Sequence, residues 1–337
     1  MSKKVAINGF GRIGRLTFRQ LFNQGVEIVA VNDLTDTKTL AYLLEFDSAQ
    51  GKFQEGKISY TDNSIIVNGK EIKIFAERNA ADLPWGKLGI DLVIESTGFY
   101  TDKEKASAHL TAGAKKVIIS APATGEMKTI VYGVNHKNLS AEDVIISGAS
   151  CTTNCLSPVA KIMDEKFGIV KGKMVTVHAV TNDQKLLDLP HGDLRRGRAA
   201  AWNIVPSTTG AAKAVSLVLP NLKGKLDGYA LRVPTITGSI TDVTLQLSKK
   251  TTVEEINATV EAAIKADAEL SKAIKFNTQQ IVSGDTIGSS FGSIFDATLT
   301  KITEVDGEQL VTVCAWYDNE SSYVSQLVRT TIYFMGL

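Results

Sequence analysis

The first part of the chain alternates between short hydrophobic runs and a stretch with hydrophobic residues at helical spacing. Val5-Ala6-Ile7-Asn8 is typical of a short buried strand, and residues 27–33 have the pattern of a second strand that ends in an acid. The positions that recur between them at helical spacing are Ile13, Leu16, Thr17, Phe18 and Leu21. This order predicts a strand, a helix and a second strand, as in the βαβ units of parallel sheets.

The turn between the first strand and the helix matches G-x-G-x-x-G, with Gly9, Gly11 and Gly14. The first glycine allows a tight turn, the second lets a pyrophosphate approach the backbone, and the third lets helix and strand pack closely. Such a turn is often only a turn, but here Asp33 stands where an acid binds the adenosine ribose. Because its charge would repel a 2′-phosphate, the pattern predicts NAD rather than NADP.

The region between residues 40 and 120 predicts an insertion followed by further core strands. Strand-like segments at 57–60, 64–67 and 71–75 include a hairpin signal, Asn68-Gly69. Arg78 follows and either lies over an adenine or is a solvated surface arginine. Core strands are expected at 90–98 and 116–120, the latter closing with Ser120. Small polar residues at such strand ends either bind ligands or only turn the chain.

Cys151 lies where a hydrophobic run at 143–146 gives way to a helical pattern, so it is predicted in the first turn of a helix. Unpaired N–H groups and the positive end of the helix dipole collect there, with Ser150 and Thr152 among the available capping residues. That field favours a thiolate, so we expect a nucleophilic sulfur near neutral pH. The alternative is a buried structural cysteine.

The second half of the chain has a different texture, which places a domain border near residue 150. Residues 174–180 alternate as a half-buried strand that carries His178, either a structural histidine or a base close to Cys151. Residues 181–206 lack clear periodicity, and residues 207–210 are a hydroxyl-rich start to another helix. Mostly antiparallel strands with helices are expected after the border.

Size and charge exclude several classes of protein. A chain of 337 residues with 44% hydrophobic and 22% charged residues is typical of about two globular domains. The net charge of +1 gives no bulk attraction to nucleic acid or membrane. Three cysteines, no signal-peptide pattern and no apolar run of membrane-spanning length favour a cytoplasmic protein. No metal site is expected.

Several motifs together resemble one family. The segments are Asn-Gly-Phe-Gly-Arg-Ile-Gly (8–14), Ser-Cys-Thr-Thr-Asn-Cys (150–155), His178 with Thr181, and Trp-Tyr-Asp-Asn-Glu (316–320). They resemble those of the phosphorylating glyceraldehyde-3-phosphate dehydrogenases, and the resemblance runs from end to end. It implies an α/β fold with a Rossmann-type NAD-binding domain over 1–150, completed by a C-terminal helix at 318–337. An α+β catalytic domain with a mostly antiparallel sheet would span 151–317.

The resemblance also implies a reaction and its residues. Cys151 matches the nucleophile and His178 the base in the oxidative phosphorylation of D-glyceraldehyde 3-phosphate to 1,3-bisphosphoglycerate, with NAD as cofactor, through a hemithioacetal and a thioester. Residues matching phosphate or substrate contacts are Ser150, Thr152, Thr181, Arg196, Thr209, Gly210 and Arg232. Those matching NAD contacts are Gly9, Gly11, Arg12, Ile13, Gly14, Asp33, Arg78, Ser120 and Asn319. A homotetramer is implied, with residues 181–206 beside a neighbouring subunit.

Alternatives remain open at this point. Erythrose 4-phosphate dehydrogenase would use the same nucleophile and cofactor. A non-enzymatic role as a surface adhesin or RNA-binding protein is a third hypothesis, although the charge does not favour nucleic acid as the main partner. Cys155, four residues after Cys151, either resolves an oxidised Cys151 or only packs in the core.

Overall fold

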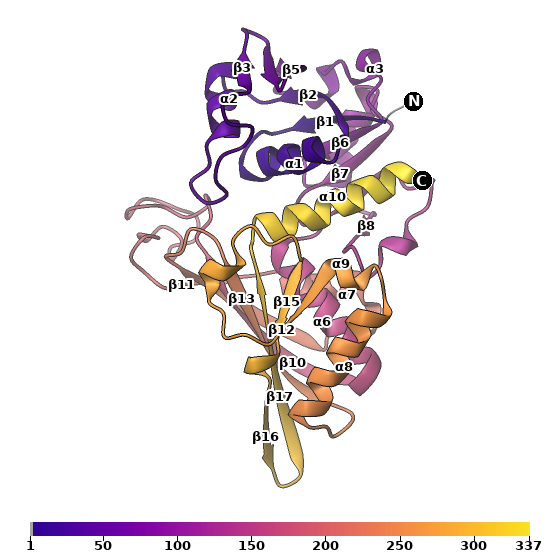
Figure 1. Ribbon diagram of the computed structural model, residues 1–337, viewed down its shortest axis with the longest axis vertical. Helices are drawn as coiled ribbons and strands as arrows, with labels where there is room; N and C mark the ends of the chain where they lie inside the picture. The colour runs from indigo at the N-terminus through magenta and orange to yellow at the C-terminus, as the bar shows by residue number, and fades with distance from the viewer. Residues whose placement is uncertain (1–2) are drawn as a thin grey trace. The chain divides into compact units, whose positions relative to one another are not determined.

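The computed structural model describes residues 3–337. These residues form two compact units (Figure 1). The first comprises residues 3–130, 136–149 and 327–337, and the second comprises residues 131–135 and 150–326. Met1 and Ser2, which the expected first domain includes, lie outside the described residues.

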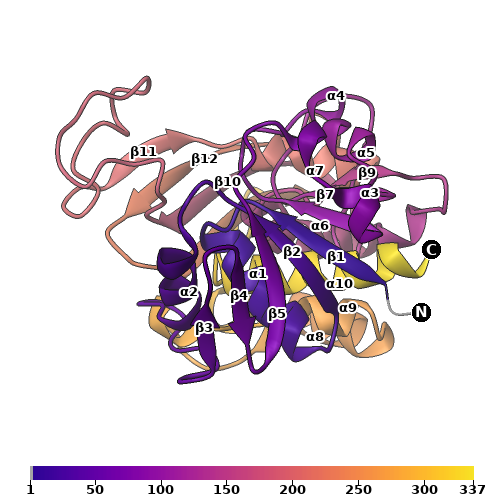
Figure 2. The same ribbon diagram turned by 90° about the horizontal axis from the view of Figure 1, so that it is seen from above.

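A largely parallel sheet forms the centre of the first unit. In spatial order its strands are β3 (Ile58–Tyr60), β4 (Ser64–Val67), β5 (Lys70–Phe75), β2 (Glu27–Asn32), β1 (Lys4–Asn8), β6 (Leu92–Glu95), β7 (Lys116–Ile119), β9 (Ile145–Ser147) and β8 (Lys128–Thr129). Neighbouring strands are parallel from β5 to β8, whereas β4 is antiparallel to both β3 and β5, and β5 lies beside β2 (Figure 2). The expected antiparallel insertion is therefore present, with Asn68 and Gly69 both at positive φ in its hairpin.

Helices of the first unit connect these strands. They are α1 (Arg12–Asn23), α2 (Thr37–Glu45), α3 (Trp85–Leu88), α4 (Lys103–Ala106), α5 (Ala108–Thr111) and the 3₁₀ turns η1 (Ala80–Asp82) and η2 (His136–Asn138). The last helix, α10 (Ser321–Gly336), belongs to this unit from Leu327 onward. It begins at Ser321, three residues after the start expected at residue 318.

The strand expected over residues 90–98 is shorter than its hydrophobic pattern. It ends at Glu95, whose buried carboxylate accepts hydrogen bonds from Thr97 N and Thr97 Oγ1. These bonds turn the chain, and Gly98 follows with a φ of 80°. The strand therefore ends where the Glu95 side chain binds the following backbone, which is a common way for acidic side chains to start a turn.

The second unit is organised on a mostly antiparallel sheet. In spatial order its strands are β11 (Val205–Thr208), β12 (Leu226–Val233), β10 (Ile169–Ala179), β13 (Ser239–Leu247), β17 (Glu308–Tyr317), β15 (Ser293–Asp296) and β14 (Ile274–Asn277), with β16 (Lys301–Val305) paired to β17. The pairs β10–β12 and β14–β15 are parallel. The expected fold class, a Rossmann-type sheet followed by an α+β unit, is confirmed.

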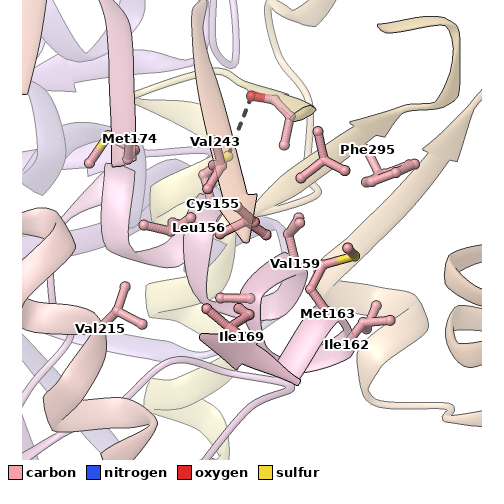
Figure 3. Packing of buried hydrophobic residues seen from close by; sticks show 14 of the residues in the cluster. Cys155, Leu156, Val159, Ile162, Met163, Ile169, Met174, Val215, Val243 and Phe295 are labelled. Atoms are coloured by element: carbon pink, nitrogen blue, oxygen red, sulfur yellow. Dashed lines mark hydrogen bonds between the residues drawn. The ribbon is translucent and has the colours of Figure 1, made fainter. Parts of the chain in front are cut away.

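Helix α6 (Cys151–Phe167) forms the centre of the second unit's core. Its buried side chains, among them Cys155, Leu156 and Met163, pack with Val243 and Phe295 of the sheet (Figure 3). The other helical segments are α7 (Ala211–Val218), α8 (Val253–Ala266), α9 (Leu270–Ala273), η3 (Pro220–Leu222), η4 (Ser283–Thr286) and η5 (Ala297–Leu299). A core of this kind holds the first turn of α6 at a fixed place on the sheet.

The segment expected to lack regular structure, residues 181–206, has no helix or strand until Val205. Val205 and Pro206 instead begin β11 and pair with Arg232 and Leu231 of β12. Pro206 is tolerated there because β11 is an edge strand. Across residues 3–337, none of the helices has the length and apolar character needed to span a bilayer.

Candidate active site

Cys151 is the first residue of α6, and the preceding residues prepare that helix end. Ser150 is the N-cap, and its Oγ accepts a hydrogen bond from Thr153 N over 3.0 Å. Ala149, before the cap, has a φ of 60°, a strained conformation for a residue other than glycine. Cys151 is half-buried, so its sulfur lies at a helix N-terminus within reach of a ligand.

His178 lies beside this sulfur, as the sequence hypothesis required. Its Nε2 is 3.4 Å from Cys151 Sγ, and its Nδ1 is 2.7 Å from the carbonyl oxygen of Ala179. Ala179 O only accepts, which favours a proton on Nδ1 and a lone pair on Nε2 toward the thiol. Arg232 Nη1, 2.9 Å from the same Nδ1, only donates and favours the opposite tautomer. The ring packs edge-on against Tyr317, with centroids 5.9 Å apart, and is 4% exposed. The imidazole is therefore held by contacts on both sides.

Arg232 places a positive charge on the other side of the imidazole. The pairing of β10 with β12 puts it directly opposite His178. Its Nη1 is 2.9 Å from His178 Nδ1, and donates to Ala179 O and Thr181 Oγ1 over 3.3 and 3.4 Å. An anion that bound Arg232 and Thr181 would lie near the imidazole and the thiol.

Burial dominates the charge states of this pair. It raises the pKa of Cys151 above its ordinary value, and the Arg232 charge and hydrogen bonds from Thr152 offset only part of this rise. Burial, reinforced by the Arg232 charge, lowers the pKa of His178 to about 3. Near neutral pH the structure therefore favours a thiol next to a neutral imidazole. Desolvation therefore opposes the stabilisation of a thiolate that the helix end was expected to provide.

Thr152 and Tyr317 form a buried hydroxyl chain under the site. Tyr317 Oη lies 2.9 Å from Thr152 Oγ1 and 2.8 Å from Thr176 Oγ1. Thr152 is 4% exposed, and one of the hydrogen-bonding positions of its hydroxyl is taken by Tyr317. Tyr317 thereby supports both the imidazole ring and the residue after Cys151.

Cys155 belongs to the core rather than to this site. Its side chain is fully buried, and its thiol donates to Ser293 Oγ and Ala315 O over 3.7 Å each. Burial raises its pKa to about 12. These surroundings favour packing over a role in redox chemistry.

A second potential anion site lies at the start of α7. Gly210 is the N-cap of this helix and contributes no side-chain cap, and a Cβ built on it would meet nothing within 4 Å. Thr209 Oγ1 accepts from Ala211 N over 3.2 Å. Arg196 Nη2 donates to Thr208 O over 3.2 Å, and its Nη1 pairs with Asp183. Open space, backbone N–H groups and an arginine suit a phosphate.

Asn319 has a side-chain amide with a fixed orientation. Its Oδ1 accepts from Gly238 N, Ser239 Oγ and Thr237 Oγ1 at 3.1, 3.1 and 3.2 Å. A backbone N–H can only donate, so the atom facing these groups is the oxygen. The Nδ2 end is therefore presented as a donor.

The glycine-rich turn of the first unit fits a dinucleotide. Gly9 has a φ of 90°, and a Cβ there would lie 2.6 Å from Thr97 N; a Cβ on Gly14 would lie 2.1 Å from Gly9 O. Gly11, the N-cap of α1, has nothing within 4 Å of its Cβ position and supplies no side-chain cap. Two glycines thus permit close packing and one leaves the helix end open, as a pyrophosphate requires.

The other predicted cofactor residues of the first unit occupy the carboxyl edge of its sheet or lie near it. Asp33 follows β2, and its carboxylate accepts from Phe10 N and Thr35 N. Arg12 pairs with Asp47, and Ile13 is half-buried. Arg78 is exposed, and its carbonyl accepts from Tyr100 Oη over 3.1 Å. Ser120 follows β7, and its N–H donates to Glu95 O.

A buried polar cluster supports this edge and was not predicted. Glu95 accepts from Asn8 Nδ2, Thr97 N and Thr97 Oγ1, and lies 2.9 Å from His109 Nε2. His109 Nδ1 accepts from Trp85 Nε1, which places the ring proton on Nε2, facing Glu95. Glu95 and His109 are 1% and 0% exposed. The carboxylate therefore links Asn8, at the end of β1 next to the glycine-rich turn, to Thr97 and His109.

The sequence predicted the residues at the starts of α1 and α6. It did not predict the buried residues that hold these two helix ends in place. Tyr317 and Asn319 stand in the motif at 316–320, where only Asn319 was assigned a role. Glu95 and Ser239 lie in ordinary strand patterns. A single acid in an otherwise apolar run was the one visible signal for Glu95. Nothing in the strand pattern indicates Ser239.

Comparison with known protein families covers both parts of the chain. Residues 3–103 match the glyceraldehyde 3-phosphate dehydrogenase NAD binding domain, and residues 150–319 match the C-terminal domain of that family. The chain is 59% identical over 334 residues to glyceraldehyde-3-phosphate dehydrogenase of Clostridium acetobutylicum and 58% identical over 334 residues to that of Clostridium pasteurianum, with 98% of each chain covered. It is 53% identical over 338 residues to that of Streptococcus pyogenes serotype M3, covering 99% of this chain and 98% of the relative. With its glycine-rich turn and its paired thiol and imidazole, this chain belongs to the glyceraldehyde-3-phosphate dehydrogenase family.

Proposed function

We propose that Cys151 is the nucleophile and His178 the acid–base group of the family's reaction. That reaction, a step of glycolysis, is the oxidation of D-glyceraldehyde 3-phosphate with NAD and inorganic phosphate to 1,3-bisphosphoglycerate. The observation that carries the assignment is the 3.4 Å contact between Cys151 Sγ and His178 Nε2 at the start of α6. A neutral imidazole within hydrogen-bonding reach of a thiol is the arrangement that a general base requires.

The first half of the reaction forms a covalent adduct on Cys151. His178 Nε2 takes the thiol proton as Sγ adds to the aldehyde carbon. The resulting oxyanion is held by the backbone N–H of Cys151 and by the imidazolium. Transfer of the proton from the imidazolium to the oxyanion gives a hemithioacetal and restores the neutral imidazole.

The second half oxidises this adduct and releases it. His178 takes the hydroxyl proton while the carbon gives up its hydrogen with two electrons, which leaves a thioester on Cys151. When bound, NAD supplies the two-electron acceptor for this step. Inorganic phosphate then attacks the thioester carbon, and Cys151 departs as a thiolate that regains a proton from His178.

Two groups of residues are assigned to the anions. Arg232 and Thr181 hold the phosphate group of the substrate, since Arg232 supplies a charge beside the site and Thr181 a hydroxyl next to it. The residues assigned to the attacking phosphate are Ser150, Thr152, Thr209 and Gly210. Arg196, which lies against Thr208 O, adds positive charge near this second group.

The NAD assignment rests on the turn and edge of the first sheet. The residues that would hold the dinucleotide are Gly9, Gly11, Arg12, Ile13, Gly14, Asp33, Arg78 and Ser120, with Asn319 as a donor to the nicotinamide carboxamide. Asp33 favours NAD over NADP because a carboxylate repels a 2′-phosphate. We assign nucleotide binding to residues 1–150 with the helix at 318–337, and catalysis to residues 151–317.

We further propose a cytoplasmic homotetramer. The support for subunit contacts is the segment before β11, where Leu186, Leu194 and Trp202 are 72%, 86% and 86% exposed. Several large apolar side chains exposed on one segment are typical of an interaction surface. Three free cysteines are compatible with a reducing compartment.

NADH absorbance tests the function directly. Glyceraldehyde 3-phosphate should give sustained NADH formation with inorganic phosphate and only a limited burst without it. Erythrose 4-phosphate, run in parallel, should be the poorer substrate by kcat/KM. A preference for the four-carbon aldehyde, or turnover that ignores phosphate, would remove the proposal. Cys151→Ser, which should bind NAD but lack turnover, is the matched control.

A further inference from the structure

Ser239, the first residue of β13, joins two parts of the site in the second unit. Ala179 N donates to Ser239 Oγ over 3.1 Å, and Ser239 Oγ donates to Asn319 Oδ1 over 3.1 Å. The carbonyl oxygen of Ala179 in turn lies 2.7 Å from His178 Nδ1. A continuous path of hydrogen bonds and one residue of backbone therefore runs from Asn319 to His178.

The direction of the two hydrogen bonds made by Ser239 is fixed. The Ala179 N–H can only donate, so Ser239 Oγ must accept there and has one proton left to give. Asn319 Oδ1 receives it, because Gly238 N already identifies that atom as the oxygen. Ser239 is 1% exposed and Asn319 is 7% exposed. With so little water present to replace a lost partner, a change at one end alters the bonds at the other.

We propose that Ser239 is a positioning residue that couples Asn319 to the His178–Cys151 pair. The inference rests on the proposed function, in which Asn319 binds the carboxamide of the cofactor and His178 accepts the thiol proton. A ligand that binds the Asn319 amide and shifts it also changes its hydrogen bond with Ser239. Ser239 in turn changes its hydrogen bond with the backbone N–H of Ala179. That backbone sets the orientation of the imidazole, and so the ease with which Cys151 loses its proton.

The coupling must act in both directions. If a bound dinucleotide changes the equilibrium constant for ionisation of Cys151, ionisation of Cys151 changes the affinity for the dinucleotide by the same factor. Removal of the Ser239 hydroxyl should then abolish both the effect of NAD on Cys151 and the effect of Cys151 on NAD affinity. A residue that only stabilised the fold would lower stability without selectively removing this linkage.

Thr237 provides a matched control on the same amide. Its Oγ1 lies 3.2 Å from Asn319 Oδ1 and 2.6 Å from Asp318 Oδ1, and it is 2% exposed. The hydrogen bonds described for Thr237 do not include one to Ala179. Thr237→Val therefore loosens Asn319 while leaving the support of His178 unchanged.

The experiment compares the parent protein, Ser239→Ala and Thr237→Val. The rate of Cys151 alkylation by iodoacetamide is measured against pH, both without NAD and with saturating NAD. NAD affinity is measured by calorimetry. Ser239→Ala should weaken NAD binding by about 2- to 12-fold, the scale of one hydrogen bond. It should also raise the pH midpoint of alkylation by about half a unit or more, and bring the ratio of rates with and without NAD close to one.

Thr237→Val should weaken NAD binding while keeping the alkylation midpoint of the parent. The coupling is overturned if Ser239→Ala keeps the parent midpoint and rate ratio, or if Thr237→Val shifts the midpoint equally. Should Ser239→Ala fail to fold by circular dichroism, Ser239→Cys, whose thiol forms weaker hydrogen bonds, is judged by the same criteria, with alkylation of Cys151 followed on its own peptide by mass spectrometry.

His178→Asn separates failure of the coupling from failure of the proposed function. A parent-like alkylation profile in His178→Asn would remove His178 as the base and with it the basis of the coupling. A shifted profile in His178→Asn with an unchanged profile in Ser239→Ala would reject the coupling alone.

Discussion

Arg232 and Cys151 lie on opposite sides of the His178 ring, with Arg232 Nη1 2.9 Å from Nδ1 and Cys151 Sγ 3.4 Å from Nε2. The arginine charge opposes protonation of the imidazole, and the thiol needs that protonation in order to ionise. An anion bound to Arg232 would offset its charge and ease proton transfer from Cys151. The phosphate of the substrate is therefore expected to assist the chemistry as well as binding.

Glyceraldehyde without its phosphate tests this expectation. It should be oxidised with a kcat at least about 10-fold lower even at saturation, because Arg232 then keeps the imidazole harder to protonate. The measurement is steady-state NADH formation over a range of each aldehyde, corrected for the fraction of free aldehyde. An equal kcat with only a higher KM would mean that the phosphate contributes binding alone.

The depressed pKa of His178 predicts a pH dependence of stability. Its pKa is about 3 in the folded protein and about 6.5 when unfolded, so the unfolded chain binds more protons between these values. The contribution of the neutral ring to stability is present above pH 6.5 and is lost as the pH falls toward 3. By pH 5 the loss amounts to roughly 2 kcal/mol of unfolding free energy.

Urea unfolding at pH 7 and pH 5 measures this loss in the parent and in His178→Asn. The parent should lose roughly 2 kcal/mol more than the variant over that interval. Equal losses in the two proteins would show that His178 does not become harder to protonate on folding. The same variant should lower kcat by roughly 10²–10⁴, the scale of a positioned acid–base group.

Cofactor choice is predicted to depend on Asp33. Asp33→Ala should raise kcat/KM for NADP relative to NAD, since the carboxylate that would repel a 2′-phosphate is gone. Loss of the hydrogen bonds from Phe10 N and Thr35 N should also weaken the turn and lower activity with both cofactors. The ratio of the two kcat/KM values is the informative quantity, and an unchanged ratio would place Asp33 away from the ribose.

Glu95 is predicted to matter for both stability and NAD binding. In Glu95→Gln an amide replaces a carboxylate whose neighbours are all donors, so at least one buried hydrogen bond is lost and one N–H group faces another. A cost of about 3 kcal/mol in unfolding free energy is expected, with weaker NAD binding as the glycine-rich turn loosens. Glu71→Gln, at an exposed position of β5, is the matched control and should change neither. Parent-like stability and affinity in Glu95→Gln would contradict the support assigned to this cluster.

Local patterns were enough to predict the two helix ends and the family. The order of strand, glycine-rich turn and helix is contained in residues 5–21, and the periodicity after Cys151 places it in the first turn of α6. The alternation around residue 178 correctly put His178 on the buried face of its strand. The resemblance drawn from the motifs is confirmed by the relatives and by the family models.

The remaining features depend on contacts between residues far apart in the chain. Tyr317 reaches Thr152 across 165 positions, and Glu95 reaches Asn8 across 87. The desolvation that raises the pKa of Cys151 could not be predicted, because a helix end is visible in a sequence whereas desolvation depends on the packed fold. Strand ends also differed where side chains such as Glu95 turn the chain.

The central claim is that Cys151 carries the acyl group between oxidation and phosphate attack. The most direct test mixes the enzyme with glyceraldehyde 3-phosphate and NAD without phosphate, quenches with acid, and locates the modified peptide by mass spectrometry. The account predicts a phosphoglyceroyl thioester on Cys151 that disappears when phosphate is added before the quench. An acyl group on another residue, or NADH formation without any acylated peptide, would contradict it.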